Sequence, residues 1–312
     1  MPASRRPWPR DVVMDAASTL SVPRPTADPV RLRAAFAHCR QLARTHYENF
    51  TVGSWLLPRR LRDEIAAVYA FARGADDIAD EGEPGPDRLR RLALWKEKLA
   101  ACARDPDALD DPVFLALGHT IARHALPVGT LGDLLEAFRR DAAGETRSFA
   151  TFSDVLAYCR YSANPVGRIV LALFGYQDAE RQERSDDICT ALQLTNFWQD
   201  VAQDHARGRV YVPQEDLARF PGSREAMAAG RVNPAFRALL AFEVERTRTL
   251  FTRGLPLAGL VEGRLAREVR MFAGGGLALL DRIEAVDHDV LGARPTLGRA
   301  DLVRIMWRGL LG

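Results

Sequence analysis

The chain has 312 residues, with 43 basic and 41 acidic side chains and a formal net charge of +2. A charge this evenly balanced gives no overall field that would attract nucleic acid, so we expect no nucleic-acid partner. Hydrophobic residues make up 47% of the sequence, but no apolar run reaches the roughly 18 residues that a membrane-spanning helix needs. The composition is that of an ordinary globular protein.

The N-terminal stretch carries prolines at positions 2, 7, 9, 23 and 25 and shows no helical period. We therefore predict a disordered or loosely attached arm over residues 1–28 and a single folded domain over residues 29–312. No apolar stretch follows the arginines near the N-terminus, so a secretory signal is not expected and a cytoplasmic location is predicted. The cysteines show no paired spacing and are predicted to be buried free thiols: Cys39, Cys102, Cys159 and Cys189.

From Pro29 onward, apolar residues recur at the three- and four-residue spacing of amphipathic helices, and Pro- and Gly-rich turns separate the segments. The sequence therefore predicts an all-α chain. Strand-like alternation is confined to Gly208–Val212, which we place in a loop. Pro165 is expected to kink the helix that contains it. The predicted helices are Val30–Tyr47, Arg60–Asp80, Arg88–Arg104, Pro112–His124, Leu131–Ala142, Phe152–Gly175, Ser185–His205, Pro234–Leu250 and Leu260–Leu291.

The first informative motif lies at the end of the second predicted helix. Tyr69, Arg73, Asp76 (or Asp77) and Asp80 follow one another at spacings of four, three and four residues, which places them in one helical stripe. Acids at a helix C-terminus face the negative end of the helix dipole, which is weak evidence for a bound cation. The plainer interpretation is a solvated acidic cap, and this motif alone does not decide between the two.

A second stripe of oxygen ligands follows on a strongly apolar helix. Asn196, Asp200 and Asp204 are four residues apart, and burying them without a partner would be costly. A polar seam satisfied by arginines is the alternative to a functional site. Two facing stripes of carboxylates without His or Cys suit Mg²⁺ and not zinc. With such ions bound, a diphosphate could approach the acids, and Arg73 is the arginine whose spacing best suits a phosphate contact.

Four segments, taken together and in this order, resemble the squalene and phytoene synthase family of head-to-head isoprenoid synthases. They span roughly residues 46 to 213 and comprise Leu56-Leu57-Pro58, Asp76-x-x-x-Asp80, Tyr158–Gly167, and Asn196-x-x-x-Asp200-x-x-x-Asp204 followed by Gly208–Pro213. The resemblance implies a class I isoprenoid-synthase fold, a single-domain helical bundle with a central apolar cavity, and a catalytic domain over residues 29–312.

The resemblance also implies roles for particular residues. Mg²⁺ and diphosphate would lie among Asp76, Asp80, Asn196, Asp200 and Asp204, with Tyr69 also in a catalytic role. A second group would contact the substrate. Its members are Asn49, Phe50, Arg73, Asp77, Tyr161, Asn164, Arg209 and Tyr211.

Within the family the chain is most similar to the bacterial hydroxysqualene synthase branch of hopanoid biosynthesis, through His46–Phe50, Ala72–Gly82, Ser162–Gly167 and Thr195–Asp200. The implied reaction expels diphosphate from presqualene diphosphate, rearranges the carbocation and captures it with water. Condensation of two prenyl diphosphates is the alternative, against which the departures from the family pattern at Tyr47–Asn49 and Ala163–Pro165 count. A non-catalytic helical assembly factor is the remaining alternative.

The expected partner is a small prenyl diphosphate, presqualene diphosphate, with functional coupling to other enzymes of the squalene pathway. Because this substrate is very hydrophobic, peripheral association with the inner membrane is compatible with the prediction. The sequence shows no basic amphipathic helix that would establish such an association.

Overall fold

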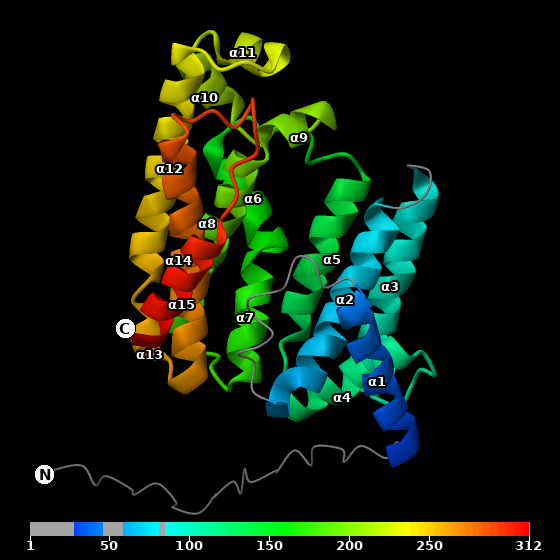
Figure 1. Ribbon diagram of the computed structural model, residues 1–312. Coiled ribbons are helices and arrows are strands. Elements are labelled where there is room, and N and C mark those ends of the chain that lie inside the picture. Colours follow the sequence, from blue (N-terminus) through cyan, green and yellow to red (C-terminus); the bar gives the residue numbers. More distant parts are fainter. Residues whose placement is uncertain (1–27, 46–58, 81–84, 312) are drawn as a thin grey trace, which may run out of the picture.

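The computed structural model describes residues 28–45, 59–80 and 85–311, and in these ranges the chain is all-α, as predicted (Figure 1). The described residues form no strand; a single isolated bridge joins Ser148 to Val210, within the segment that was placed in a loop. The first half of the chain supplies η2 (Arg59–Leu61) and the helices α1 (Pro29–Thr45), α2 (Arg62–Asp80), α3 (Pro86–Arg104), α4 (Pro112–His124) and α5 (Val128–Ala142).

The second half supplies the remaining helices. They are α6 (Phe152–Ser162), α7 (Asn164–Leu173), α8 (Ala179–Gln199), α9 (Val201–Ala206), α10 (Gln214–Arg219), α11 (Ser223–Ala229), α12 (Pro234–Gly254), α13 (Leu257–Leu260), α14 (Gly263–Ala285) and α15 (Arg299–Leu311). The arm predicted over residues 1–28 lies almost wholly outside the described residues, and so do Asn49 and Phe50.

Two hydrophobic clusters hold the bundle together. One lies among α1–α5 around Phe71 and Phe114, and the other lies among the later helices around Trp198 and Phe251. Helix α7 contributes to both, because successive faces of a helix point in different directions: Ile169 belongs to the first cluster and Leu171 to the second. The two halves therefore pack against a shared helix.

Pro165 interrupts the predicted helix Phe152–Gly175, as expected. Helix α6 ends at Ser162, and α7 begins at Asn164 with the proline in its first turn, where the missing N–H has no helical partner to lose. The prediction of one uninterrupted helix over Ser185–His205 was wrong. The chain becomes helical earlier, at Ala179 behind the cap Asp178, and α8 gives way to α9 at Asp200, whose backbone has φ −103° and ψ 13°.

The C-terminal region also differs from its prediction. The expected helix Leu260–Leu291 is divided into α13 and α14, and α14 stops at Ala285, just before Asp287 and His288 adopt φ values of 52° and 61°. Helix α15 follows along the outside of α14 and was not predicted (Figure 1). No described helix is both long and apolar enough to cross a membrane.

The cysteines are free thiols, as predicted. Cys39, Cys102 and Cys159 are buried, and Cys189 is half-buried. Burial raises the pKa of the Cys39 thiol to about 12, so this group stays protonated at neutral pH.

Candidate active site

The acidic end of α2 is built around one arginine. Arg73 Nη1 lies 3.0 Å from Asp76 Oδ2, and its Nη2 lies 2.6 Å from Asp77 Oδ1. Asp80, one turn further on, keeps 61% of its side chain exposed. Burial, followed by repulsion from Asp80, raises the pKa of Asp76. Arg73 therefore compensates only part of the negative charge at this helix end. Tyr69 is half-buried on the same helix, and burial raises its pKa.

The second acidic segment lies where α8 meets α9. Asn196 is exposed there and is not a buried polar residue. The backbone N–H of Asp200 donates to Asn196 O at 2.9 Å, and that of Asp204 donates to Asp200 O at 2.8 Å, so the i to i+4 ladder runs through the interruption. The three predicted ligands thus remain on successive turns. Burial, followed by repulsion from Asp200, raises the pKa of Asp204 to about 6.

Arg294, which the sequence did not single out, holds Asp200. Its guanidinium binds the Asp200 carboxylate through both Nε and Nη2 and also donates to Gln199 Oε1 at 2.9 Å. The side-chain amide of Gln199 in turn donates to Pro295 O at 2.5 Å. The loop between α14 and α15 therefore fixes the carboxylate at the helix junction. No spacing in the sequence connects residues so far apart.

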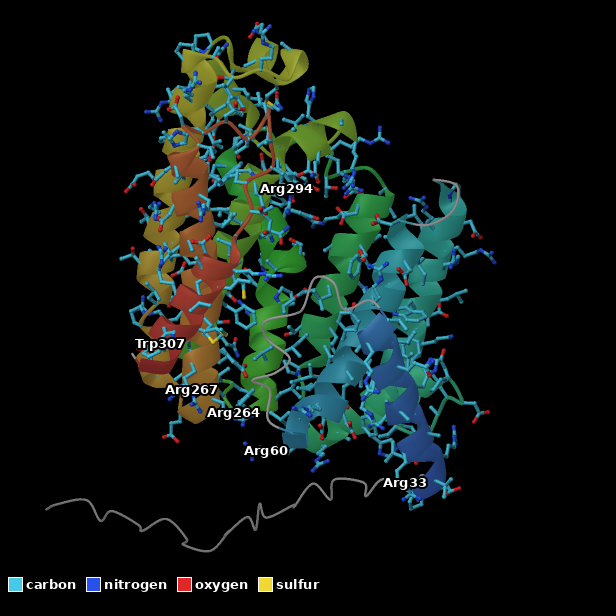
Figure 2. All side chains as sticks on the ribbon, viewed as in Figure 1. Arg33, Arg60, Arg264, Arg267, Arg294 and Trp307 are labelled. Atoms are coloured by element: carbon cyan, nitrogen blue, oxygen red, sulfur yellow. The ribbon has the colours of Figure 1, made fainter. Side chains whose placement is uncertain are left out.

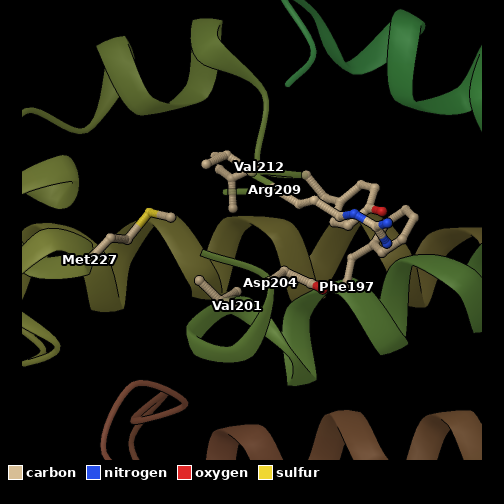
Figure 3. A pocket seen from close by; sticks show the side chains of 8 residues that line it. Phe197, Val201, Asp204, Arg209, Val212 and Met227 are labelled. Carbon is tan, nitrogen blue, oxygen red and sulfur yellow. The ribbon is translucent and has the colours of Figure 1, made fainter. Parts of the chain in front are cut away.

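Arg209 joins the two acidic segments across the bundle. Its Nη2 lies 3.8 Å from Asp80 Oδ1 at the end of α2. Its own backbone N–H donates to Asp204 O at 2.8 Å, just after α9. Figure 3 shows Arg209 and Asp204 on the wall of a small cavity that Phe197 also lines. The predicted substrate residue Arg209 thus lies between the two motifs.

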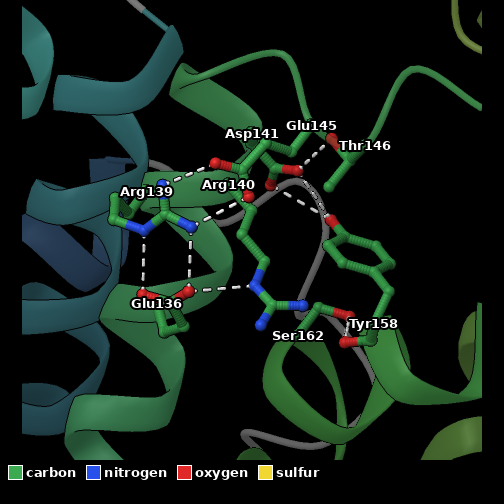
Figure 4. Close-up of polar contacts among 8 residues, drawn as sticks. All are labelled: Glu136, Arg139, Arg140, Asp141, Glu145, Thr146, Tyr158 and Ser162. Carbon is green, nitrogen blue, oxygen red and sulfur yellow. Dashed lines mark hydrogen bonds and ion pairs between the residues drawn. The ribbon is translucent and has the colours of Figure 1, made fainter. Parts of the chain in front are cut away.

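A further acid, Asp141 in the last turn of α5, belongs to the same group and was missed. It accepts hydrogen bonds from Thr146 Oγ1 at 2.6 Å and from Tyr158 Oη at 3.0 Å (Figure 4). Burial raises its pKa; Arg209 opposes this rise and Asp80 adds to it. Its place at a helix C-terminus is the signal that also marked Asp76 and Asp80. The acid four residues on, Glu145, lies beyond the end of α5 and is bound by Arg139.

Arginines gather around these acids. A pocket of about 360 Å³ is lined by Arg88, Arg147, Arg207 and Arg209, with Asp141 on its wall. Arg88 donates to the carbonyl oxygens of Ala79 at 2.7 Å and Asp80 at 3.0 Å, and so covers the end of α2. Guanidinium groups present paired N–H donors that match phosphate oxygens. This end of the bundle can therefore receive an anion beside its carboxylates.

A stack of aromatic rings lies beside the acidic residues. The rings of Phe197 and Tyr211 lie 3.8 Å apart at an angle of 4°, and Tyr158 stacks on Tyr211 at 6.2 Å. Tyr211 is 7% exposed, and burial raises its pKa to about 12. Phe197 and Tyr211 thus place apolar surface beside Asp204 and Arg209, with which they line the small cavity.

Two of the predicted substrate residues are engaged elsewhere. Asn164 is 8% exposed and accepts a hydrogen bond from Thr190 Oγ1 at 2.9 Å, which ties α7 to α8. Tyr161 lies beneath the guanidinium of Arg140, 4.4 Å from its ring centroid. Substrate contact for Asn164 and Tyr161 stays a prediction.

The acids fit a divalent cation that is shared with a ligand. Within the described ranges, no three His, Cys, Asp or Glu side chains come close enough to hold a metal by themselves. Asp76 and Asp204 both have raised pKa values, with an aspartate of the same motif as a contributing cause, so they carry repulsion that a cation would relieve. Mg²⁺ commonly takes few protein carboxylates and completes its shell with water and substrate phosphate.

The described chain is a helical bundle that gathers acidic and basic side chains at one end. The squalene/phytoene synthase family model matches residues 43–301, and the chain belongs to that family. It is therefore an enzyme that processes prenyl diphosphates.

Individual relatives bear different names. The chain is 37% identical over 240 residues to a hydroxysqualene synthase of Rhodopseudomonas palustris, which covers 76% of this chain and 78% of the relative. It is 28% identical over 291 residues to a 15-cis-phytoene synthase of Synechococcus elongatus, which covers 87% and 91%. Among solved structures, squalene synthase HpnC from Alicyclobacillus acidocaldarius matches with a TM-score of 0.79 and 42% identity, over 84% of this chain and 97% of that one.

Proposed function

We propose that this chain is a hydroxysqualene synthase, which ionises presqualene diphosphate with the help of Mg²⁺ and captures the rearranged carbocation with water. The observation that carries the proposal is the meeting of Asp80 and Arg209 at 3.8 Å, which joins both acidic motifs into one anion site. The hydroxysqualene synthase among the relatives, at 37% identity, supports the choice of substrate and product.

The residues that would hold Mg²⁺ are Asp76, Asp80, Asn196, Asp200 and Asp204. Mg²⁺ supplies charge neutralisation for the diphosphate as the carbon–oxygen bond breaks. Arg209 lies where it can contact both Asp80 and a phosphate oxygen, and Arg88 and Arg207 line the same pocket. Their donors stabilise negative charge that develops on the leaving group.

Other side chains of the bundle hold the carboxylates of the proposed site in position. Arg294 holds Asp200 and Tyr158 holds Asp141, so both carboxylates are oriented by protein donors. Mg²⁺ would share the Asp200 carboxylate with Arg294. The stacked rings of Phe197 and Tyr211 would lie between the bound diphosphate and the apolar interior. We propose that the prenyl chains occupy that interior, between the two hydrophobic clusters, where water reaches the carbocation only in a controlled way.

Condensation of two prenyl diphosphates remains the second candidate, because a phytoene synthase also matches nearly the whole chain. The two reactions are separated by supplying presqualene diphosphate and farnesyl diphosphate in parallel and identifying the lipid product of each. Formation of hydroxysqualene from presqualene diphosphate supports the proposal. Efficient consumption of farnesyl diphosphate alone would identify the condensing enzyme.

A further inference from the structure

The side of helix α15 that packs against the rest of the protein is not its most apolar side. Among the residues of α15 whose burial the structure describes, the buried ones are Asp301, Ile305 and Gly309, which follow one another at four-residue spacing. A Cβ added at Gly309 would lie 2.4 Å from Met271 Cγ, so the glycine allows close contact with α14. Asp301 accepts a hydrogen bond from Arg282 Nη2 at 2.7 Å. The inner side of this amphipathic helix is therefore partly polar and small.

Four other large apolar residues of α15 point the other way. Leu302 is 36% exposed, Val303 49%, Met306 44% and Trp307 64%. Residues at these spacings share one side of a helix, so they form a continuous outer stripe. A helix of a globular protein ordinarily turns such a stripe to the core. We name these four residues the α15 stripe.

Most of the charged side chains around the α15 stripe are basic. The outer residues of α15 and of the first half of α14 include Arg264, Arg299 and Arg304, all exposed, and the half-buried Arg267 and Arg270. The acids of the same two segments, Glu268 and Asp301, are only 3% and 6% exposed. Three exposed acids lie nearby. Glu262 immediately precedes α14, and Asp281 and Glu284 in the second half of α14 both pair with Arg248. Figure 2 shows Trp307, Arg267 and Arg264 at the same end of the molecule.

We propose that the α15 stripe and the surrounding arginines dock this chain on an anionic lipid bilayer. An apolar stripe that carries a tryptophan and is bordered by basic side chains is the composition of helices that lie in a membrane interface. The charges also disfavour a second copy of the chain as the occupant, because a two-fold interface would place arginines against arginines. The proposal extends the proposed function, on which it rests for its purpose, since both its substrate and its product are membrane lipids.

The test is co-sedimentation of the full-length chain with vesicles of phosphatidylcholine alone and of phosphatidylcholine containing phosphatidylglycerol. We expect binding to the anionic vesicles and at least about tenfold weaker binding to the neutral ones. Because salt screens charges at the surface, binding to the anionic vesicles should fall when NaCl is raised to about 0.5 M. The variant with Met306→Glu and Trp307→Glu should lose about tenfold or more in partitioning. Both side chains are exposed, so the melting temperature should not change.

The matched control is Leu94→Glu, at an apolar residue of α3 that is 48% exposed on another surface. It should bind anionic vesicles as the unaltered chain does. Equal binding by the double variant, equal loss in the control, or failure of the unaltered chain to bind would each overturn the proposal. So would sedimentation that shows a lipid-free dimer which the double variant converts to a monomer.

Vesicle binding is measured without substrate, and product formation is measured in detergent. A chain that binds vesicles but forms no hydroxysqualene would overturn the proposed function and leave the docking surface standing. A chain that forms hydroxysqualene in detergent but ignores anionic vesicles would overturn the docking surface alone.

Discussion

Arg209 reaches Asp80 from the opposite half of the chain, with 3.8 Å between Nη2 and Oδ1. Because Arg209 follows α9 directly and its N–H is bonded to Asp204 O, the contact fixes how the two acidic motifs face each other. Arg209→Gln should therefore weaken binding of the diphosphate and raise KM about tenfold or more, as loss of a charged hydrogen bond does. Arg209→Lys should recover part of the affinity, since a lysine keeps the charge without the fork.

Steady-state kinetics on both variants checks this prediction. Arg91→Gln, at an exposed arginine of α3, serves as the control and should leave KM unchanged. An unaltered KM in Arg209→Gln would mean that Arg209 does not contact the diphosphate.

The acidic motifs predict a strict need for metal. Chelation should abolish turnover and Mg²⁺ should restore it, because a diphosphate cannot approach Asp76, Asp80, Asp200 and Asp204 without cations. Replacing Asp80 or Asp200 by Asn should lower kcat by about a hundredfold or more, with the helical circular dichroism little changed. Asp110→Asn is the control, since the side chain of Asp110 is fully exposed far from the motifs. Full activity in excess EDTA would contradict the account.

Asp141 and Tyr158 should act as a coupled pair. Tyr158 Oη lies 3.0 Å from both carboxylate oxygens, and burial raises the pKa of both groups. Unfolding free energies of Tyr158→Phe, Asp141→Asn and the double variant should be non-additive by about 1 kcal/mol, within the usual range for contacting residues. Additive effects would show that the hydrogen bond contributes nothing measurable to stability.

A buried acidic pair away from the site predicts how stability changes with pH. Glu243 is 0% exposed and shares Arg246 with Asp216, and burial raises its pKa from 4.5 to about 8. A carboxyl whose pKa is higher in the folded than in the unfolded protein stabilises the fold while protonated. That contribution is complete below pH 4.5 and is lost as the pH rises through about 8.

Thermal unfolding from pH 5 to pH 8.5 checks this. The unaltered chain should lose stability over that range relative to Glu243→Gln, which cannot ionise, while Glu245→Gln, on the same helix and less buried, should follow the unaltered chain. Parallel curves for the unaltered chain and Glu243→Gln would show that Glu243 is ionised at all these pH values.

Helical periodicity and the positions of prolines predicted most of the helices and their boundaries. Pro165 marked the break between α6 and α7, because its ring excludes a preceding helical turn. No proline or glycine in the sequence indicates the break at Asp200. The backbone ladder continues to Asp204 N, so apolar spacing is preserved across it, and the residue that holds the carboxylate, Arg294, comes from a distant loop.

The site was predictable only where its residues repeat along a helix. Asp76, Asp80, Asp200 and Asp204 were found because they recur at helical spacing. Asp141 has no acidic partner within α5 and joins them through tertiary packing. Helix α15 was missed although its apolar residues recur at helical spacing. Periodicity gives the apolar side of a helix but not what that side contacts, so the outward orientation of Trp307 could not be predicted.

The central claim is that water ends the reaction of presqualene diphosphate, and isotopic oxygen tests it most directly. The full-length chain is supplied with presqualene diphosphate, Mg²⁺ and ¹⁸O-labelled water, with and without NADPH, and the lipid product is analysed by mass spectrometry. The account predicts an alcohol that carries the label, in the same yield with or without NADPH. Squalene formed only in the presence of NADPH would contradict it.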